Sequence, residues 1–411
     1  MRDIKSLKTL IESQLSQLFE EISVINLVDL FVEYAYSTKA SDIHIEPTKE
    51  KTRVRYRIDG LLYDVFEKSI VSAELHQEII SRIKVLSGLR TDEHLLPQDG
   101  RFKAKIEGFG DVDVRVSIMP TYYGENAILR VLAETQDFTL NDLGFSPKDL
   151  KRVEAAIQKP YGMILANGPT GSGKTTTLYT ILKKLNQPET SVITIEDPIE
   201  YSLAGTTQIQ TNTQVGLTFA NGLRSILRQD PNIIMVGEIR DQETAGIAVN
   251  AALTGHLVLS TLHTNDAATT FPRLLDMGVP PFLVASTVNV AMGQRLVRII
   301  CRKCKTKRAL SQEEIKSVSE LVPDIKEGPR VFFEGKGCSE CGQTGYQGRT
   351  GIREVLVIDE DIRQLIMSRA NANQIKEAAV KNGMTTMLRD GLEKAQKGVT
   401  SLEEVLRIIH E

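Results

Sequence analysis

The sequence predicts an α/β protein with two domains of different size, and two patterns lead to this prediction. From about Leu150 onward, short apolar runs such as GMILAN, SVITIED, NIIMVGE and HLVLSTL alternate with helix-like segments. Continuous apolar strands separated by helices are typical of a parallel sheet that is buried on both faces. Earlier in the chain, strict alternation in runs such as TRVRYRI predicts half-buried strands, and therefore a separate, smaller α/β domain.

The composition sets limits on the class of protein. The chain has 411 residues, of which 41% are hydrophobic and 25% are charged, as in ordinary globular proteins of two to four domains. A formal net charge of −3 gives no reason to expect a nucleic-acid partner. We find no run of about 18 apolar residues and no apolar signal-peptide core at the N-terminus. We therefore expect a cytoplasmic protein that reaches a membrane through partners.

The changes in periodicity predict the domain organisation. Leucines and isoleucines recur at helical spacing in the first 23 residues, and Asp59-Gly60 between two alternating runs predicts a hairpin. The stretch from Glu134 to Pro147 is polar and loop-like. The expected units are an N-terminal helix at 1–23, an α/β domain at 24–133, a linker at 134–148, the main α/β domain at 149–300, a cysteine module at 301–345 and a mostly helical region at 346–411.

The clearest chemical motif is a phosphate-binding loop. GPTGSGKT fits the pattern G-x-x-x-x-G-K-[ST], and it lies between an apolar strand and a helix-like segment, as that pattern requires. Glycines let backbone N–H groups curl around phosphates, Lys174 reaches the outer phosphates, and the Thr175 hydroxyl is the expected Mg²⁺ ligand. The motif therefore predicts ATP binding and hydrolysis. The expected nucleotide-binding residues are Gly168, Pro169, Thr170, Gly171, Ser172, Gly173, Lys174, Thr175 and Thr176.

Two apolar strands end in carboxylates that are candidates for catalysis. TIEDPIE supplies Glu196, and IIMVGEIRD supplies Glu238 as a second catalytic candidate and as a Mg²⁺ candidate. The second segment resembles a magnesium-binding strand, but Gly237-Glu238 stands where an Asp is expected directly after the apolar run, so the metal contact is expected to be through water. The alternative for each acid is a helix N-cap or a turn residue.

Histidines and arginines give weaker signals. His256 and His263 flank an apolar strand, and without a third ligand at helical spacing they do not indicate zinc. They are either ordinary strand-end histidines or groups that sense phosphate or communicate between subunits. Arg115, Arg130 and Arg240 are either solvated surface residues or arginine fingers.

All four cysteines fall into two C-x-x-C pairs. Cys301 and Cys304 form the first pair, expected to follow a helix, and Cys338 and Cys341 form the second, among glycines. Four thiolates in this arrangement predict a closed, structural Zn²⁺ site. The alternative is a redox C-x-x-C, which normally lies at a βα junction.

Taken together, the motifs resemble those of the secretion ATPase superfamily, which includes the type II secretion ATPase and the type IV pilus assembly ATPase. The segments that carry this resemblance are SDIHIEP, GPTGSGKTTTLY, TIEDPIEY, LRSILRQDP, GEIRD, TGHLVLSTLHTNDA and the paired C-x-x-C motifs. The resemblance implies a PAS-like first domain, a RecA-like P-loop ATPase domain and a homo-hexameric ring.

The same resemblance implies roles for individual residues. Glu196 matches the catalytic base of the family's Asp box, and Glu238 matches its atypical Walker B glutamate. His256 and His263 match its His box, and Arg115 and Arg130 match arginines that approach the nucleotide.

The resemblance also implies a function and a partner. The C-x-x-C pairs are characteristic of the assembly branch and are absent from retraction ATPases, so we expect a motor that powers assembly of pilin-like subunits. Its partner would be an inner-membrane platform protein, on which members usually dock through a further N-terminal domain. This sequence begins almost directly at its first α/β domain. The alternatives are a retraction ATPase, a nucleic-acid translocase on the same core, and an inactive nucleotide-binding scaffold.

Overall fold

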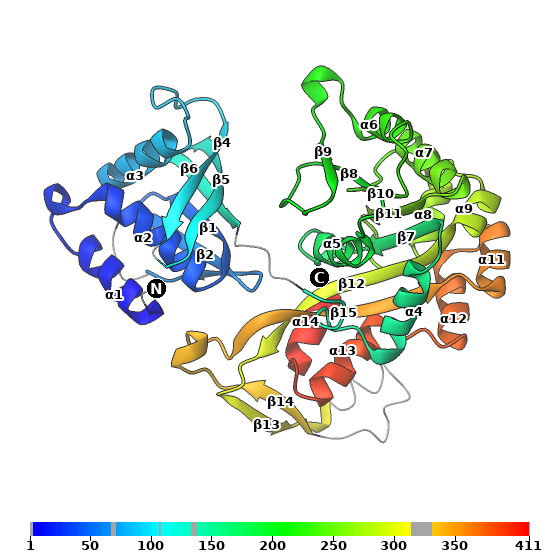
Figure 1. The fold of residues 1–411 in the computed structure, drawn as a ribbon. Coiled ribbons are helices and arrows are strands. Elements are labelled where there is room, and N and C mark those ends of the chain that lie inside the picture. The colour runs from blue at the N-terminus through cyan, green and yellow to red at the C-terminus, as the bar shows by residue number, and fades with distance from the viewer. Residues whose placement is uncertain (1–2, 67–70, 107, 133–137, 314–330, 411) are drawn as a thin grey trace. The chain divides into compact units, whose positions relative to one another are not determined.

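The structure is a computed structural model that describes residues 3–66, 71–106, 108–132, 138–313 and 331–410. Its internal contacts divide the chain into two units, Met1–Gln136 and Asp137–Glu411 (Figure 1). Each unit has its own hydrophobic core and is described by itself.

The first unit is a six-stranded antiparallel sheet with helices on one face, drawn blue to cyan in Figure 1. The strand order is β3-β2-β1-β6-β5-β4. The helices are α1 (Ile4–Leu15), α2 (Val24–Ser37) and α3 (Ala73–Leu86), with a short 3-10 turn at Phe19–Glu21. The strands are β1 (Ala40–Pro47), β2 (Thr52–Ile58), β3 (Leu61–Asp64), β4 (Gln98–Ile106), β5 (Gly110–Thr121) and β6 (Gly124–Leu132).

The predicted alternation in this unit is confirmed. In β2, Val54 and Tyr56 are buried while the arginines between them are half-buried. Asp59 and Gly60 have φ values of 49° and 91°, the left-handed pair that a two-residue hairpin turn requires. The prediction of one helix over 1–23 is wrong, because α1 ends at Leu15, the last apolar residue of its buried stripe.

The second unit is built on a seven-stranded sheet with the order β15-β12-β7-β11-β10-β8-β9. Its strands are parallel except β15, which runs antiparallel to β12. They are β7 (Gly162–Asn167), β8 (Val192–Glu196), β9 (Thr207–Gln210), β10 (Ile233–Val236), β11 (Leu257–Leu262), β12 (Val288–Ile300) and β15 (Tyr346–Val357). A separate two-stranded sheet pairs β13 (Lys305–Ala309) with β14 (Val331–Gly335).

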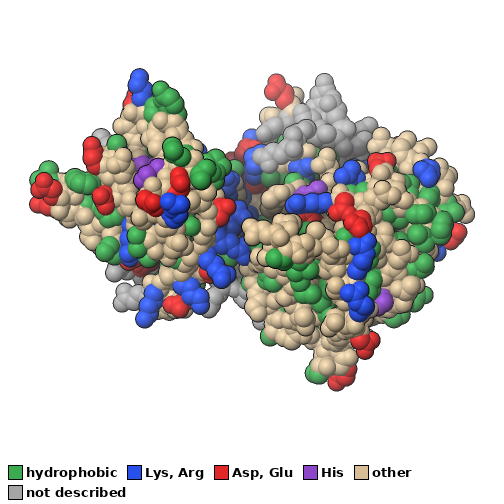
Figure 2. Space-filling view, turned by 90° about the horizontal axis from the view of Figure 1, so that it is seen from above, with side chains coloured by type: hydrophobic (Ala, Val, Ile, Leu, Met, Phe, Trp, Pro, Cys, Tyr) green, Lys and Arg blue, Asp and Glu red, His purple; other side chains and the backbone are tan. Residues whose placement is uncertain are grey.

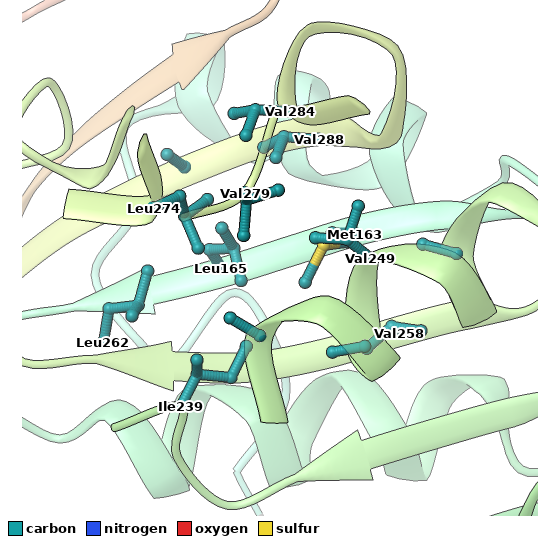
Figure 3. Close-up of a cluster of buried hydrophobic side chains, with 14 of the residues drawn as sticks. Met163, Leu165, Ile239, Val249, Val258, Leu262, Leu274, Val279, Val284 and Val288 are labelled. Atoms are coloured by element: carbon teal, nitrogen blue, oxygen red, sulfur yellow. The ribbon is translucent and has the colours of Figure 1, made fainter. Parts of the chain in front are cut away.

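Helices cover both faces of the larger sheet, as the apolar strands predict. Buried side chains of α4 (Pro147–Ile157) and α5 (Lys174–Leu185) pack on one face. The other face is covered by α6 (Phe219–Ile226), α7 (Gln242–Leu253), α8 (Thr270–Asp276), α9 (Pro281–Thr287), α11 (Glu360–Met367) and α12 (Ala372–Lys381). Figure 3 shows this second cluster, where Met163, Leu165 and Val258 point from the strands toward the helices. The chain ends in α13 (Met387–Gln396) and α14 (Leu402–His410). Within the described ranges, no helix combines the length and apolar character needed to cross a bilayer.

Two expectations about the C-terminal part are wrong. The residues after Gly351 continue as β15 to Val357, and helices begin at Glu360. Cys301 follows the strand β12, where a helix was expected. In both places the strand is buried on both faces over several residues, so its apolar run does not alternate and helical spacing can be fitted to it.

The described part of the expected linker is anchored to the second unit. Residues 138–146 form no helix or strand, yet Leu140 and Leu143 are buried in the core beside α4 and α5. The guanidinium of Arg353, on β15, donates to the carbonyl of Leu143 and lies 4.5 Å from the ring centroid of Phe145. These contacts fix the point where the chain enters the second unit.

Candidate nucleotide-binding site

The phosphate-binding loop connects the carboxyl end of β7 to the N-terminus of α5. Because β7, β11, β10 and β8 are parallel, their carboxyl ends meet at one edge of the sheet, where open α/β sheets bind their ligands. Three loop glycines have positive φ values, 147° at Gly168, 79° at Gly171 and 85° at Gly173. A Cβ on Gly168 would lie 2.4 Å from the carbonyl oxygen of Gln294, so this turn requires glycine. The loop therefore aims backbone N–H groups and a helix N-terminus at one point.

Lys174 is the buried cation of this loop. Its Nζ donates to the carbonyl oxygens of Gly168 at 2.8 Å and Pro169 at 2.9 Å. Burial lowers the pKa of Lys174, and the nearby Glu238 carboxylate opposes that effect. Two of the three ammonium donors are used by the loop itself, which leaves one donor for a phosphate oxygen.

A neighbouring strand braces the loop from below. Gln294, on β12 and fully buried, donates from Nε2 to the carbonyl oxygen of Ser172 at 2.8 Å and accepts from Thr177 Oγ1 at 3.0 Å. Ser172 Oγ is buried and has no hydrogen-bond partner within the described part of the chain. Buried hydroxyls normally have partners, so an unpaired one inside this loop fits a site that binds a polar ligand.

Glu238 lies at the end of β10, beside the same edge. Its carboxylate forms an ion pair with Arg240 at 2.6 Å and a contact with His263 Nε2 at 3.0 Å. Gly237, which replaces the expected Asp, packs closely on the next strand, since a Cβ there would lie 3.3 Å from the Cα of Glu196. The departure from the usual strand pattern therefore has a packing reason.

Glu196 ends β8 and is enclosed by hydrogen-bond donors. Oε2 accepts from the hydroxyl of Tyr179, while Oε1 accepts from Thr194 Oγ1 at 2.6 Å and Gln208 Nε2 at 3.2 Å. Burial, together with the bond to Glu196, raises the pKa of Tyr179, so this phenol stays protonated as a donor. The Glu196 carboxylate is thus buried with both oxygens engaged.

The structure separates the two histidines. His263 follows the carboxyl end of β11 and contacts Glu238. His256 precedes the amino end of the same strand, and its Nδ1 lies 2.9 Å from the carbonyl oxygen of Ala251. A single parallel strand puts its two ends at opposite edges of the sheet, so His256 is not brought to the phosphate-binding loop within one chain.

The candidate arginines lie in both units. Arg240 pairs with Glu238, as described above. Arg115 and Arg130 are opposite each other on β5 and β6 of the first unit. The Nε of Arg130 donates to Asp42 at 3.0 Å. Asp241, another strand-end acid, is the N-cap of α7 and accepts from the backbone N–H of Thr244 at 2.8 Å.

The four cysteines converge on one point. Their sulfur atoms all lie within 4.8 Å of one another, with Sγ–Sγ distances of 3.8 Å for Cys301–Cys338 and for Cys304–Cys341. Four sulfurs at about 2.3 Å around a tetrahedral zinc ion are about 3.8 Å apart. Although burial raises it, backbone N–H groups of Cys338 and Gly345 lower the pKa of Cys341 to about 7. These donors favour a thiolate, the form that binds a metal.

Comparison with known proteins decides the family. A family model described as type II/IV secretion system protein matches residues 17–407. The chain belongs to this family. Type IV pilus assembly ATPase PilB of Myxococcus xanthus (strain DK1622) is 45% identical over 394 residues, which are 96% of this chain and 69% of that protein. Type II secretion system protein E of Xanthomonas campestris pv. campestris is 47% identical over 397 residues, with coverage of 96% and 69%.

Solved structures of this kind have the same fold. The pilus retraction motor PilT with bound ADP matches with a TM-score of 0.61 and 26% identity, covering 92% of this chain and 96% of that one. The Legionella pneumophila ATPase DotB matches with a TM-score of 0.69 and 24% identity, covering 94% and 95%, and supports the fold. The predicted fold class, the resemblance to the secretion ATPases and the prediction of an ATP hydrolase are therefore confirmed.

Several residues of this secretion ATPase site could not be singled out from motifs. Tyr179 and Gln208 hold Glu196, and Gln294 holds the phosphate-binding loop. A weak signal exists for Gln294, because it interrupts the apolar run VNVAMG of a buried strand. Buried amides usually have specific partners, so a glutamine in such a run indicates a polar contact.

We expect Gln294→Leu to weaken binding of a non-hydrolysable ATP analogue about tenfold. The change leaves the carbonyl of Ser172 and the hydroxyl of Thr177 buried without their partner, which costs about 1–3 kcal/mol per group and loosens the loop. Calorimetric titration in the presence of Mg²⁺ measures the affinity. Gln158→Leu, at the exposed end of α4, is the matched control and should bind normally. Equal affinities for both variants would contradict the bracing role of Gln294.

Proposed function

We propose that this ATPase is a homo-hexameric motor that powers the assembly of pilin-like subunits, in a type II secretion pseudopilus or an extending type IV pilus. We further propose that it acts in the cytoplasm and reaches the inner membrane through a platform protein. The observation that carries the proposal is the phosphate-binding loop with Lys174 and Glu238 at one sheet edge, in a chain 45–47% identical to proteins named for pilus assembly and type II secretion.

The proposed roles follow from the geometry of this edge. Lys174 and the amides of Gly168–Thr175 bind the outer phosphates, and the Thr175 hydroxyl and Glu238 are the residues that would hold Mg²⁺. A bound Mg²⁺ neutralises charge on the phosphate oxygens. Because Glu238 already contacts His263 and Arg240, these two side chains orient its carboxylate and respond to charge in the site.

Glu196 is the proposed catalytic base. In the described conformation both of its oxygens accept hydrogen bonds, so the carboxylate is held in its charged form by Tyr179, Thr194 and Gln208. To accept a proton from an attacking water, one of these donors must give way. We propose that this exchange accompanies the binding of ATP, and that Arg115, Arg130 and His256 act between subunits of the ring.

Assembly is favoured over the alternatives by similarity and charge. The retraction motor PilT is 26% identical to this chain, well below the assembly and secretion relatives. A nucleic-acid translocase is less favoured because the formal net charge is −3, and acidic and basic side chains both occur on the face drawn in Figure 2.

The cysteine cluster is the proposed site of one structural Zn²⁺. Four thiol groups at tetrahedral spacing, with backbone N–H groups directed at Cys341, are a donor set that fits zinc. The two pairs come from segments far apart in sequence and face each other across the cluster, unlike a redox C-x-x-C, in which the two cysteines of one motif react. Bound metal would join the end of β12 to the segment that precedes β15.

Lys174→Ala and Glu238→Gln should each lower ATP turnover at least about 100-fold. Both changes remove a charge directed at the phosphates, and loss of one such group commonly costs that much. Phosphate release from purified chain with Mg²⁺·ATP is the measurement. Glu243→Gln, an exposed acid on α7 that pairs with Arg224, is the control and should keep full turnover. Wild-type turnover in either site variant would refute the assigned machinery.

Turnover should rise when the purified chain is mixed with vesicles containing the inner-membrane protein that co-purifies with it, and it should not rise with DNA. A motor coupled to a membrane partner is expected to hydrolyse ATP slowly when alone. The comparison uses equal protein at low and moderate salt, because nucleic-acid stimulation is strongly salt-dependent. Stimulation by DNA but not by the vesicles would favour the translocase alternative.

Metal analysis of the purified chain should find one zinc ion per chain, and Cys338→Ser should abolish binding. Removal of zinc with a chelator should lower the melting temperature, because the metal joins segments that are distant in the chain. Glu340→Gln is a close control, since Glu340 lies inside the second pair but its carboxylate contacts Lys303. A metal-free chain with unchanged melting would contradict the zinc site.

A further inference from the structure

Glu354 is a buried acid that has no place in the machinery described so far. It lies on β15 and is 1% exposed. Its Oε1 accepts from the backbone N–H of Ala267 at 2.7 Å, and its Oε2 accepts from the backbone N–H of Met387 at 3.2 Å. A buried charge is costly unless it is well paired, so this carboxylate is held by specific partners.

The first partner, Ala267, belongs to a loop that starts at the nucleotide site. We call residues 263–269 the post-β11 loop; its first residue is His263, whose ring contacts Glu238. Within the loop, Asp266 Oδ1 accepts from the backbone N–H and the hydroxyl of Thr269 at 2.8 Å and 2.6 Å. Ala267 is fully buried. The loop is therefore a compact turn whose position depends on the group that binds Ala267.

The packing around Glu354 leaves no room for adjustment. A Cβ on Gly293, which is opposite Glu354 in the β12–β15 pair, would lie 2.9 Å from the nitrogen of Ala267 and 3.0 Å from the Cγ of Glu354. Gly293 is also paired with Asn167, the residue before the phosphate-binding loop, and Asn167 Nδ2 donates to Thr270 Oγ1 at 2.7 Å. The base of the post-β11 loop is thus fixed to two strands of the nucleotide site.

The second partner, Met387, opens helix α13. The N-cap of this helix is Thr386, so the Glu354 carboxylate faces a helix N-terminus, which favours negative charge. Burial raises the pKa of Glu354, while the hydrogen bond from Ala267 and the charge of Lys376 oppose that effect. Two N–H donors match a carboxylate but not a carboxamide, whose NH₂ group would face one of them.

We propose that Glu354 is a positioning residue for ATP hydrolysis. Its carboxylate ties the post-β11 loop to the N-terminus of α13 and so keeps His263 on the carboxylate of Glu238. This inference rests on the roles proposed above for Glu238 and His263. Its consequence is that the C-terminal helices set the geometry of the catalytic edge without touching the nucleotide.

The test is Glu354→Gln in the full chain. We expect kcat for ATP to fall about 10- to 100-fold, the usual effect of a small misplacement in an active site, while KM for ATP and the affinity for a non-hydrolysable analogue change less than about twofold. A purely structural role would lower the melting temperature without this split. An unchanged kcat in a folded Glu354→Gln protein would overturn the proposal.

Two comparisons make the test specific. Asp390→Asn is the matched control, because Asp390 is another buried acid of this region that accepts from the backbone N–H of Arg353 at 2.8 Å; it should lose stability and keep kcat. In a His263→Ala background, Glu354→Gln should lower kcat little further, since both changes break the same link. Fully additive losses would overturn the proposal.

A variant on the surface covers the case in which Glu354→Gln does not fold. Lys376 is 39% exposed at its side chain and pairs with Asp266 of the post-β11 loop at 3.3 Å. Lys376→Gln should lower kcat about threefold with KM unchanged, and an unchanged kcat would count against the proposal. An inactive wild-type chain would instead refute the proposed function itself, so the two failures are distinguishable.

Discussion

The functional side chains of the second unit depend on the shared direction of four strands. Because β7, β8, β10 and β11 are parallel, the phosphate-binding loop, Glu196, Glu238 and His263 all follow carboxyl ends at one edge. The register between strands is equally important, since a slip of one residue would exchange the side chains on the two faces. In β12 such a slip would turn Gln294 away from the loop that it supports. The hydrophobic core on both faces therefore fixes the catalytic edge as well as the fold.

Buried polar side chains connect the core to this edge. Gln294, Glu196 and Glu354 each lie on a strand, and each bonds to a different neighbouring element. An unpaired buried polar group costs about 1–3 kcal/mol, so each of these side chains favours one arrangement of its partners over others. The site is thus rigid where the strands supply such groups. Arg240 and His263, which are about half exposed or more, reach Glu238 from loops and are freer to respond to a ligand.

Much of this arrangement could be predicted from the sequence, for reasons that are local. The phosphate-binding loop is one continuous segment with special backbone angles, and the apolar strands GMILAN and HLVLSTL match β7 and β11 closely. The cysteine pairs are recognisable because their ligand chemistry requires a fixed spacing. The partners of Glu196 were beyond reach, because Tyr179 and Gln208 come from separate elements and neither stands out from its neighbours. The strand β12 was missed before Cys301, since a strand buried on both faces has no period of two to detect.

The strand β12 has a further consequence. It pairs with β7 as far as Gly293 and beyond that with β15 alone, so residues 294–300 form a two-stranded ribbon that leaves the sheet. Gln294 stands at the root of this ribbon, and Cys301 follows its tip, about 23 Å away at the usual rise per residue. The ribbon is therefore a lever arm. A tilt of about 5° at the root would move the cysteine cluster by about 2 Å, so a subtle change under the phosphates becomes a visible displacement at the far end of the arm.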